Sequence, residues 1–189
     1  MTNVIGIIGE YNPFHNGHKY HLEKSKQLLN ADYVVAVVSG NFVQRGNVSL
    51  IDKWAKAEMA INNGVDLVIE LPTIYSISSA ENFAFGAVKT LDSLNVVDYL
   101  SFGTETYDLN ILNKIADILY YQPSEYVSLL NHELSKGISF PKARENAVLM
   151  YLNDIRTYAN ILSTPNNILG IEYLKALKRI KSSIRPMNV

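Results

Sequence analysis

The chain has 189 residues, a formal net charge of −1 and no cysteine. With 48% hydrophobic and 19% charged residues it has the composition of a globular protein, which excludes a mostly disordered chain. The lack of cysteine excludes disulfides, thiolate metal sites and cysteine nucleophiles, and the near-neutral charge argues against indiscriminate nucleic-acid binding. We expect a cytoplasmic protein, because no apolar run approaches the roughly 18 residues of a membrane span and no signal peptide is evident.

The first hundred residues alternate between apolar, β-branched runs and helical patterns. Strands are predicted at residues 3–9, 33–38, 66–71 and 97–102, and helices at 17–30, 52–63 and 79–94. In the first helix we expect the side chains of Tyr20, Leu22, Leu28 and Leu29 to point partly inward. The alternation predicts an α/β fold with a Rossmann-like, doubly wound parallel sheet over residues 1–107.

Beyond residue 107 the pattern changes to successive helices. Their predicted starts are Asp108, Ser124, Ser139 and Thr164, the last followed by a proline at the first helical position. We therefore expect residues 108–189 to form a mainly helical extension packed on the core. Residues 184–189 also fit the start of a fifth strand.

Three of the four histidines, His15, His18 and His21, lie within seven positions after the first predicted strand. Open α/β sheets bind ligands at the carboxyl ends of their strands, and the first turn of a helix attracts phosphate. His15 and His18 are three residues apart with Gly17 between them, so both rings can donate hydrogen bonds to one phosphoryl group. A metal-binding pair is disfavoured because carboxylates and cysteines at ligand spacing are lacking. His21 fits a packing, surface or ligand-facing role equally well.

The motif His15-Asn16-Gly17-His18 resembles the signature of the HIGH-type nucleotidyltransferases. The longer run of residues 6–18 resembles the N-terminus of the bacterial tRNA(Met) cytidine acetate ligase family. Three further blocks, residues 39–46, 101–105 and 165–174, resemble the same family in the same order. The resemblance spans nearly the whole chain.

The resemblance implies the HIGH-type nucleotidyltransferase fold and an ATP-dependent ligase. Such an enzyme activates acetate as acetyl-adenylate, releases pyrophosphate and acetylates N4 of the wobble cytidine of elongator tRNA(Met). It implies ATP accompanied by Mg²⁺, with His15 and His18 acting on the phosphates and Gly103 beside the adenine or ribose. The ATP-binding residues implied in this way are Ile7, Ile8, Gly9, Glu10, Tyr11, Asn12, Pro13, Phe14, His15, Asn16, Gly17, His18, Lys19, Tyr20, Gly103 and Asn167.

Three charged residues follow predicted strands on the ligand side. Arg45 could hold acetate, a phosphate or an RNA backbone, since a guanidinium matches such anions in a bidentate way; the alternative is a solvated loop arginine. Glu10 and Glu105 could each hold Mg²⁺ or a ribose hydroxyl, or could equally cap a neighbouring helix.

Other basic residues are expected to be solvated. Lys53 and Lys56 are predicted to lie on an exposed helix face, with Trp54 packed inward. The basic residues between 175 and 185 are predicted to form a solvated face, with contact to tRNA phosphates as the minority interpretation.

Two other functions remain open at this point. One is a nucleotidyltransferase that adenylylates a small phosphate ester. The other is a non-catalytic module that binds nucleotide or tRNA. The second is raised because the family's later Lys-Arg-Ile-Gly and Ser/Thr-Ile-Arg segments and its C-terminal region are expected to be absent from these 189 residues.

Overall fold

The structure, a computed structural model, describes residues 2–189. Its strands are β1 (Val4–Gly9), β2 (Tyr33–Ser39), β3 (Leu67–Leu71), β4 (Tyr99–Phe102) and β5 (Arg185–Asn188). Its α-helices are α1 (Asn16–Leu29), α2 (Lys53–Asn62), α3 (Thr73–Ser76), α4 (Ala80–Ser93), α5 (Leu109–Tyr121), α6 (Ser124–Ser135), α7 (Phe140–Leu152), α8 (Ile155–Tyr158) and α9 (Pro165–Ile180). Two 3₁₀ turns complete the set, η1 (Gln44–Gly46) and η2 (Ile161–Ser163).

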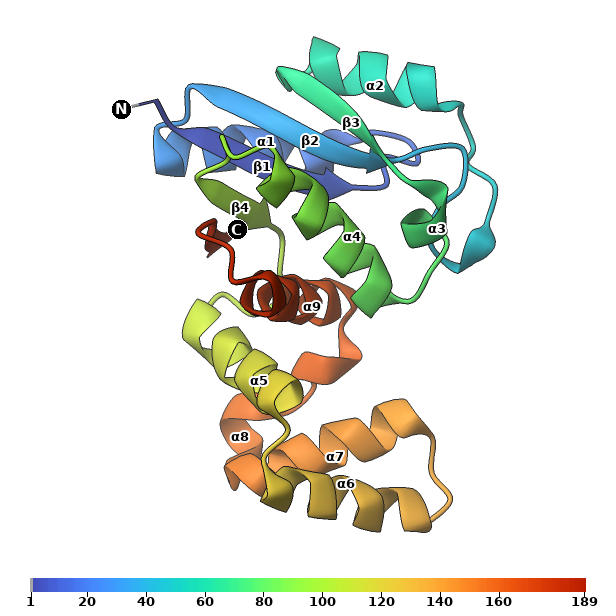
Figure 1. Ribbon diagram of the computed structural model, residues 1–189, viewed down its shortest axis with the longest axis vertical. Helices are drawn as coiled ribbons and strands as arrows, with labels where there is room; N and C mark the ends of the chain where they lie inside the picture. Colours follow the sequence, from blue (N-terminus) through green and yellow to red (C-terminus); the bar gives the residue numbers. More distant parts are fainter. Residues whose placement is uncertain (1) are drawn as a thin grey trace.

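The strands form one parallel sheet in the order β3-β2-β1-β4-β5 (Figure 1). From β1 the chain moves outward to β2 and β3, and then crosses to the opposite side of β1 to form β4. The order reverses between β1 and β4, and this switch point is where open α/β sheets bind ligands. The prediction of a doubly wound parallel sheet followed by a helical segment is confirmed.

The central strand β2 shows why the sheet is covered on both faces. Val34, Ala36 and Val38 belong to one apolar cluster with Leu22 of α1. The alternate residues of β2 belong to the other cluster, which includes side chains of α4, α5 and α9. Because side chains alternate along a strand, a continuously apolar run is what a strand between two helical layers requires.

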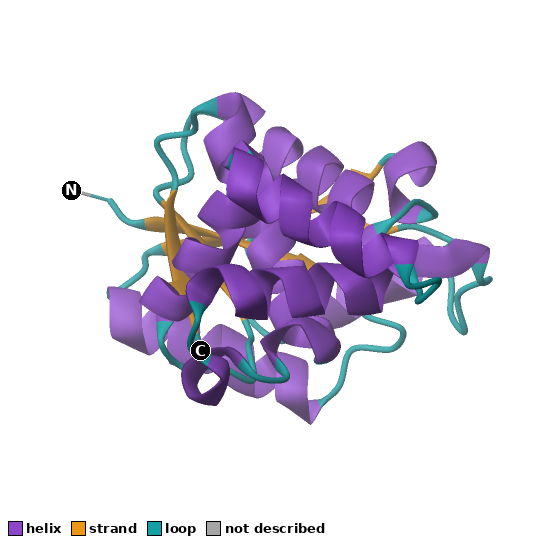
Figure 2. Cartoon of the chain, turned by 90° about the horizontal axis from the view of Figure 1, so that it is seen from below, coloured by secondary structure: helices purple, strands orange, loops and turns teal. Residues whose placement is uncertain are grey.

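The segment after β4 builds a helical region below the sheet. In Figure 1, α9 lies beneath α4, α5 lies beneath α9, and the α6–α7 pair is farthest from the strands. Figure 2 looks along that direction, with purple helices in front of the orange strands. After α9 the chain returns to the sheet as β5, which pairs with β4. The boundary between residues 107 and 108 stays a prediction. Within the described chain, every helix is too short or too polar to cross a bilayer.

Two helix faces differ from the prediction. In α1, Leu22 is buried, whereas Tyr20 and Leu28 are 62% and 50% exposed, because both lie off the narrow stripe that meets the sheet. In α9, the expected solvated face is wrong for Lys175. Its side chain is only 13% exposed and forms an ion pair with Glu172 at 2.7 Å.

One glycine fixes the close approach of α3 and α4. A Cβ at Gly86 would lie 2.2 Å from Cγ of Tyr75. We expect Gly86→Ala to lower the free energy of unfolding by about 1–3 kcal/mol, despite the better helix propensity of alanine. Urea denaturation measures this, with Gly103→Ala as the control, because a Cβ there meets no atom within 4 Å. Equal loss in both variants would contradict the expected steric clash.

Candidate active site

A cavity of about 490 Å³ opens at the carboxyl ends of β1 and β4. The predicted residues that line it are Ile7, Ile8, Gly9, Glu10, Tyr11, His15, Gly17, His18 and Gly103. Residues not assigned from the sequence also line it: His21, Gln44, Phe83, Phe102, Asn166, Leu169 and Tyr173. The other predicted residues lie outside this lining: Asn12, Pro13, Phe14, Asn16, Lys19, Tyr20, Asn167 and the exposed Arg45.

His15 and His18 form the N-terminal cap of α1. Nδ1 of His15 accepts a hydrogen bond from the backbone N–H of Gly17 at 3.1 Å. Nδ1 of His18 accepts one from the backbone N–H of His15 at 3.2 Å. The rings are stacked, with centroids 3.7 Å apart. Because each Nδ1 is an acceptor, each neutral ring carries its proton on Nε2 and presents Nε2–H as a donor.

Burial keeps the second ring of this pair neutral. Desolvation, together with the nearby His15 and His21, lowers the pKa of His18 to about 4. The ring also packs against Tyr11 and Phe14, with centroids 4.9 and 5.5 Å away. At neutral pH, His18 therefore offers a neutral hydrogen-bond donor whose orientation is fixed by packing and by the cap.

The free ring nitrogen of His21 is a hydrogen-bond acceptor, whereas the free ring nitrogens of His15 and His18 are donors. The Ser25 hydroxyl donates to the His21 carbonyl at 2.6 Å, so its single proton is used. The Ser101 hydroxyl must then donate to Ser25 at 2.7 Å, which leaves Nε2–H of His21 to donate to Ser101 at 3.0 Å. Burial lowers the pKa of His21 to about 4. The neutral ring consequently presents Nδ1 as an acceptor, and the three histidines combine two donors with one acceptor.

Two side chains tie the loop after β1 to the loop after β2. Oε1 of Glu10 accepts a hydrogen bond from the backbone N–H of Gln44 at 2.8 Å. Oδ1 of Asn12 accepts from the Ser49 hydroxyl at 2.9 Å and from the backbone N–H of Leu50 at 2.7 Å. Both loops therefore hold fixed positions along the rim of the cavity. Asn12 acts here through backbone placement, away from the cavity lining.

Glu105 and Asn167 organise the N-terminus of α9. The carboxylate of Glu105 accepts from the backbone N–H groups of Asn166 at 3.2 Å and Asn167 at 2.8 Å, so it caps a neighbouring helix. The amide of Asn167 is buried and bonds to Thr106 and Thr164. Asn166, its neighbour, is the residue that reaches the cavity lining.

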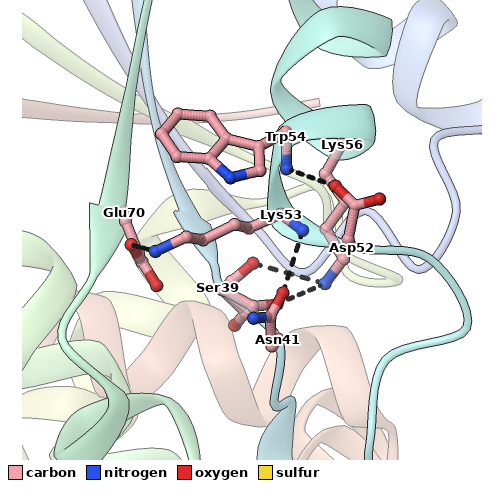
Figure 3. Close-up of polar contacts among 8 residues, drawn as sticks. Ser39, Asn41, Asp52, Lys53, Trp54, Lys56 and Glu70 are labelled. Atoms are coloured by element: carbon pink, nitrogen blue, oxygen red, sulfur yellow. Dashed lines mark hydrogen bonds and ion pairs between the residues drawn. The ribbon is translucent and has the colours of Figure 1, made fainter.

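Asp52 caps α2 as predicted, but the predicted directions of the Lys56 and Trp54 side chains are wrong. Lys56 is fully buried, and its ammonium donates to the carbonyls of Ser39 at 3.3 Å and Gly40 at 2.9 Å. Trp54 is 75% exposed and lies beside Lys53, which pairs with Glu70 (Figure 3). The side chain of Asp52 caps the helix and fixes this register.

Lys56 lies outside the cavity lining, with its ammonium bound at the end of β2. Burial lowers its pKa, and the nearby Glu10 carboxylate acts in the opposite direction. Across the cavity, burial and the same carboxylate raise the pKa of Tyr173. Within residues 2–189, no group of three or more His, Cys, Asp or Glu side chains is arranged to hold a metal ion.

The cavity, its capped histidine pair and the parallel sheet agree with the comparison to known families. Residues 2–189 match the HIGH Nucleotidyl Transferase family. The chain belongs to this family. The resemblance of the His15–His18 motif to the HIGH-type nucleotidyltransferases is therefore confirmed.

Relatives of this HIGH nucleotidyltransferase chain have a more specific name. The chain is 59% identical over 186 residues to the tRNA(Met) cytidine acetate ligase of Caldanaerobacter subterraneus, covering 98% of this chain and 46% of the relative. It is 56% identical over 191 residues to the ligase of that name from Clostridium botulinum, covering 99% and 47%. The crystal structure of Thermotoga maritima TmcAL bound with alpha-thio ATP superposes with a TM-score of 0.92 at 45% identity, covering 100% of this chain and 46% of that one. The chain thus spans about half the length of the curated relatives it matches.

Proposed function

We propose that this chain binds ATP in the cavity at the switch point, as the catalytic part of a tRNA(Met) cytidine acetate ligase. The observation that carries the proposal is the stacked His15–His18 pair, which presents two Nε2–H donors at the start of α1. Donors at a helix N-terminus suit a triphosphate. Support also comes from the names of the relatives and from the alpha-thio ATP bound by the Thermotoga maritima protein.

Residues 7–20, Gly103 and Asn167 remain the proposed ATP-binding set. Gly103 leaves open space at the end of β4, where a ribose or adenine ring would lie. The side chain of Asn167 is used in holding the start of α9, so we propose that it orients this helix toward the nucleotide. The Nδ1 acceptor of His21 suits a hydroxyl or amino group of the nucleoside.

The proposed chemistry has two steps. A carboxylate oxygen of acetate forms a bond to the α-phosphorus of ATP while the bond to the β-phosphate breaks, and its electron pair leaves with pyrophosphate. N4 of the wobble cytidine then attacks the acetyl carbon, loses a proton and displaces AMP. In the first step His15 and His18 donate to phosphoryl oxygens whose charge grows, and acetate, already an anion, needs no general base.

Glu10 is the residue we propose for Mg²⁺. Its Oε1 accepts from Gln44, and no hydrogen bond from the described residues engages Oε2. Mg²⁺ in nucleotide sites is commonly held by one or two carboxylates together with substrate phosphates, which a single free carboxylate oxygen fits. When bound, the ion neutralises phosphate charge. Both oxygens of Glu105 already cap α9, so we exclude Glu105 from this role.

Elongator tRNA(Met) is the proposed acceptor, and the cytoplasm, where tRNA and ATP are available, is the proposed compartment. Arg45 is exposed on η1 with a φ of 66°, outside the cavity lining. An exposed guanidinium beside the site fits an RNA phosphate better than a small anion inside the cavity.

The test uses the full-length protein with ATP, labelled acetate and elongator tRNA(Met). We expect acetate-dependent exchange of labelled pyrophosphate into ATP, followed by N4-acetylcytidine in the tRNA. Exchange driven by a small phosphate ester and not by acetate would favour a different nucleotidyltransferase. ATP binding by calorimetry with no exchange and no product would favour a binding module.

A further inference from the structure

Gln44 carries an unpaired polar atom beside the cavity. Among residues 2–189, the buried side-chain nitrogen and oxygen atoms without a hydrogen-bond partner belong to Ser39, Gln44 and Arg144. Of these three residues, Gln44 alone lines the cavity, and its unpaired atom is the amide nitrogen Nε2. Buried donors are nearly always satisfied in folded proteins, so a donor left without a partner at a cavity indicates a ligand acceptor.

The backbone around Gln44 is fixed independently of its side chain. Its N–H donates to Oε1 of Glu10 at 2.8 Å. The N–H of Gly46 donates to the carbonyl of Val43 at 3.1 Å, and Asn12 holds the later part of the same loop. The Gln44 backbone is therefore held at a defined place beside the cavity, and no hydrogen bond from the described residues engages the side-chain amide nitrogen.

The sheet order separates Gln44 from the part of the cavity proposed for the nucleoside. Gly103 and Asn166 reach the cavity from the β4 side of β1. Gln44 reaches it from the β2 side, and the His15–His18 pair lies at the end of β1 between them. A small ligand bound to Gln44 would lie beside the phosphates without occupying the space of the adenosine.

We infer that Gln44 binds the acyl substrate, donating its amide N–H to one carboxylate oxygen of a small monocarboxylate such as acetate. This inference rests on the proposed function. The second carboxylate oxygen is left to form the bond to the α-phosphorus in the step written above. Gln44 is thus a substrate-binding residue for the carboxylate group of the acid.

The chemistry favours a neutral amide over a cation at this position. An ion pair with lysine or arginine stabilises the carboxylate charge and makes its oxygen a weaker nucleophile, whereas a neutral donor orients it at lower cost in reactivity. Lys56 does not line the cavity, and its ammonium donates to the carbonyls of Ser39 and Gly40. Its charge lies near Glu10 and offsets the repulsion that this carboxylate would exert on acetate.

The experiment compares Gln44→Leu with the wild-type full-length protein in acetate-dependent ATP–pyrophosphate exchange. We expect KM for acetate to rise about 10- to 100-fold, the effect of losing one hydrogen bond to a charged group, while KM for ATP stays within about twofold. Gln44→Glu replaces the donor with a second carboxylate and should raise KM for acetate further. The matched control is Gln27→Leu, the same change at an exposed position of α1.

Calorimetric titration with ATP serves as the folding check, since every Gln44 variant keeps the backbone bond to Glu10. An unchanged KM for acetate in Gln44→Leu, with exchange intact in the wild type, overturns the inference and leaves the proposed function standing. A parallel rise in KM for ATP and for acetate also overturns it, because the amide would then act on the nucleotide. Absence of acetate-dependent exchange in the wild type overturns both.

Discussion

If the proposed function holds, replacing His18 with alanine is expected to lower kcat for acetate-dependent ATP–pyrophosphate exchange by about 10²- to 10³-fold, with a smaller change in KM for ATP. In the proposed reaction its neutral Nε2–H donates to a phosphoryl oxygen whose negative charge grows as pyrophosphate leaves, so the bond would be strongest in the transition state. Steady-state exchange kinetics at saturating ATP measure the effect.

His18→Asn separates the donor from the helix cap. An asparagine oxygen can still accept the backbone N–H of His15, the bond that Nδ1 of His18 makes now, but its amide does not reach the position of Nε2. We expect this variant to lose as much activity as His18→Ala, while only His18→Ala loses about 1 kcal/mol of cap stability. His132→Ala, on the exposed face of α6, is the control and should be fully active. Wild-type activity in His18→Asn would contradict a donor role.

Acidification from pH 7 to pH 4 is expected to destabilise the folded chain through two partly buried histidines, His18 and His21. Burial lowers the pKa of His18 and of His21 to about 4, from the ordinary value of 6.5. Between these values the unfolded chain binds more protons, so the free energy of unfolding falls as the pH falls. Above about pH 6.5, both rings are neutral in the folded and the unfolded chain, so they no longer reduce the free energy of unfolding. Each unit of pKa difference corresponds to about 1.4 kcal/mol, so His21 contributes a loss of about 2–3 kcal/mol by pH 4. His18 contributes less, because its ring is only partly buried and solvent screens its charge.

His21→Gln isolates that contribution from the titration of carboxylates. The glutamine amide can replace Nε2–H as the donor to Ser101, and it does not titrate in this range. In urea denaturation at several pH values, the variant should lose about 2 kcal/mol less stability than the wild type on acidification. His132→Gln should keep the full wild-type dependence. Parallel curves for His21→Gln and the wild type would contradict the assignment.

The local patterns predicted most of what surrounds the cavity. The apolar run of β2, the alternation of strands and helices, and the His15–His18 spacing each depend on residues close in sequence. These signals fixed the sheet, its switch point and the helix start that faces it. For the same reason the family could be recognised before any contact was known.

The directions of side chains whose partners lie far away in the sequence were less predictable. Lys56 and Trp54 are two positions apart in α2, and composition favoured burying the tryptophan. The opposite holds, because the carbonyls at the end of β2 accept the Lys56 ammonium, and those acceptors come into range only when the sheet forms. Glu105 left two roles open until the N–H groups of α9, some sixty residues later, were found against its carboxylate.

The sequence by itself determined the α/β sheet, the start of α1 at the cavity and the HIGH nucleotidyltransferase family, because strand patterns, helix starts and motif spacing are local properties. Only the tertiary structure decided which nitrogen of His21 carries the proton. That choice depends on its hydrogen bond to Ser101, which lies on β4, 80 residues away in the sequence. It also decided that Gln44 joins the cavity with an unpaired amide, since burial and partnership exist only once β1 and β2 lie side by side.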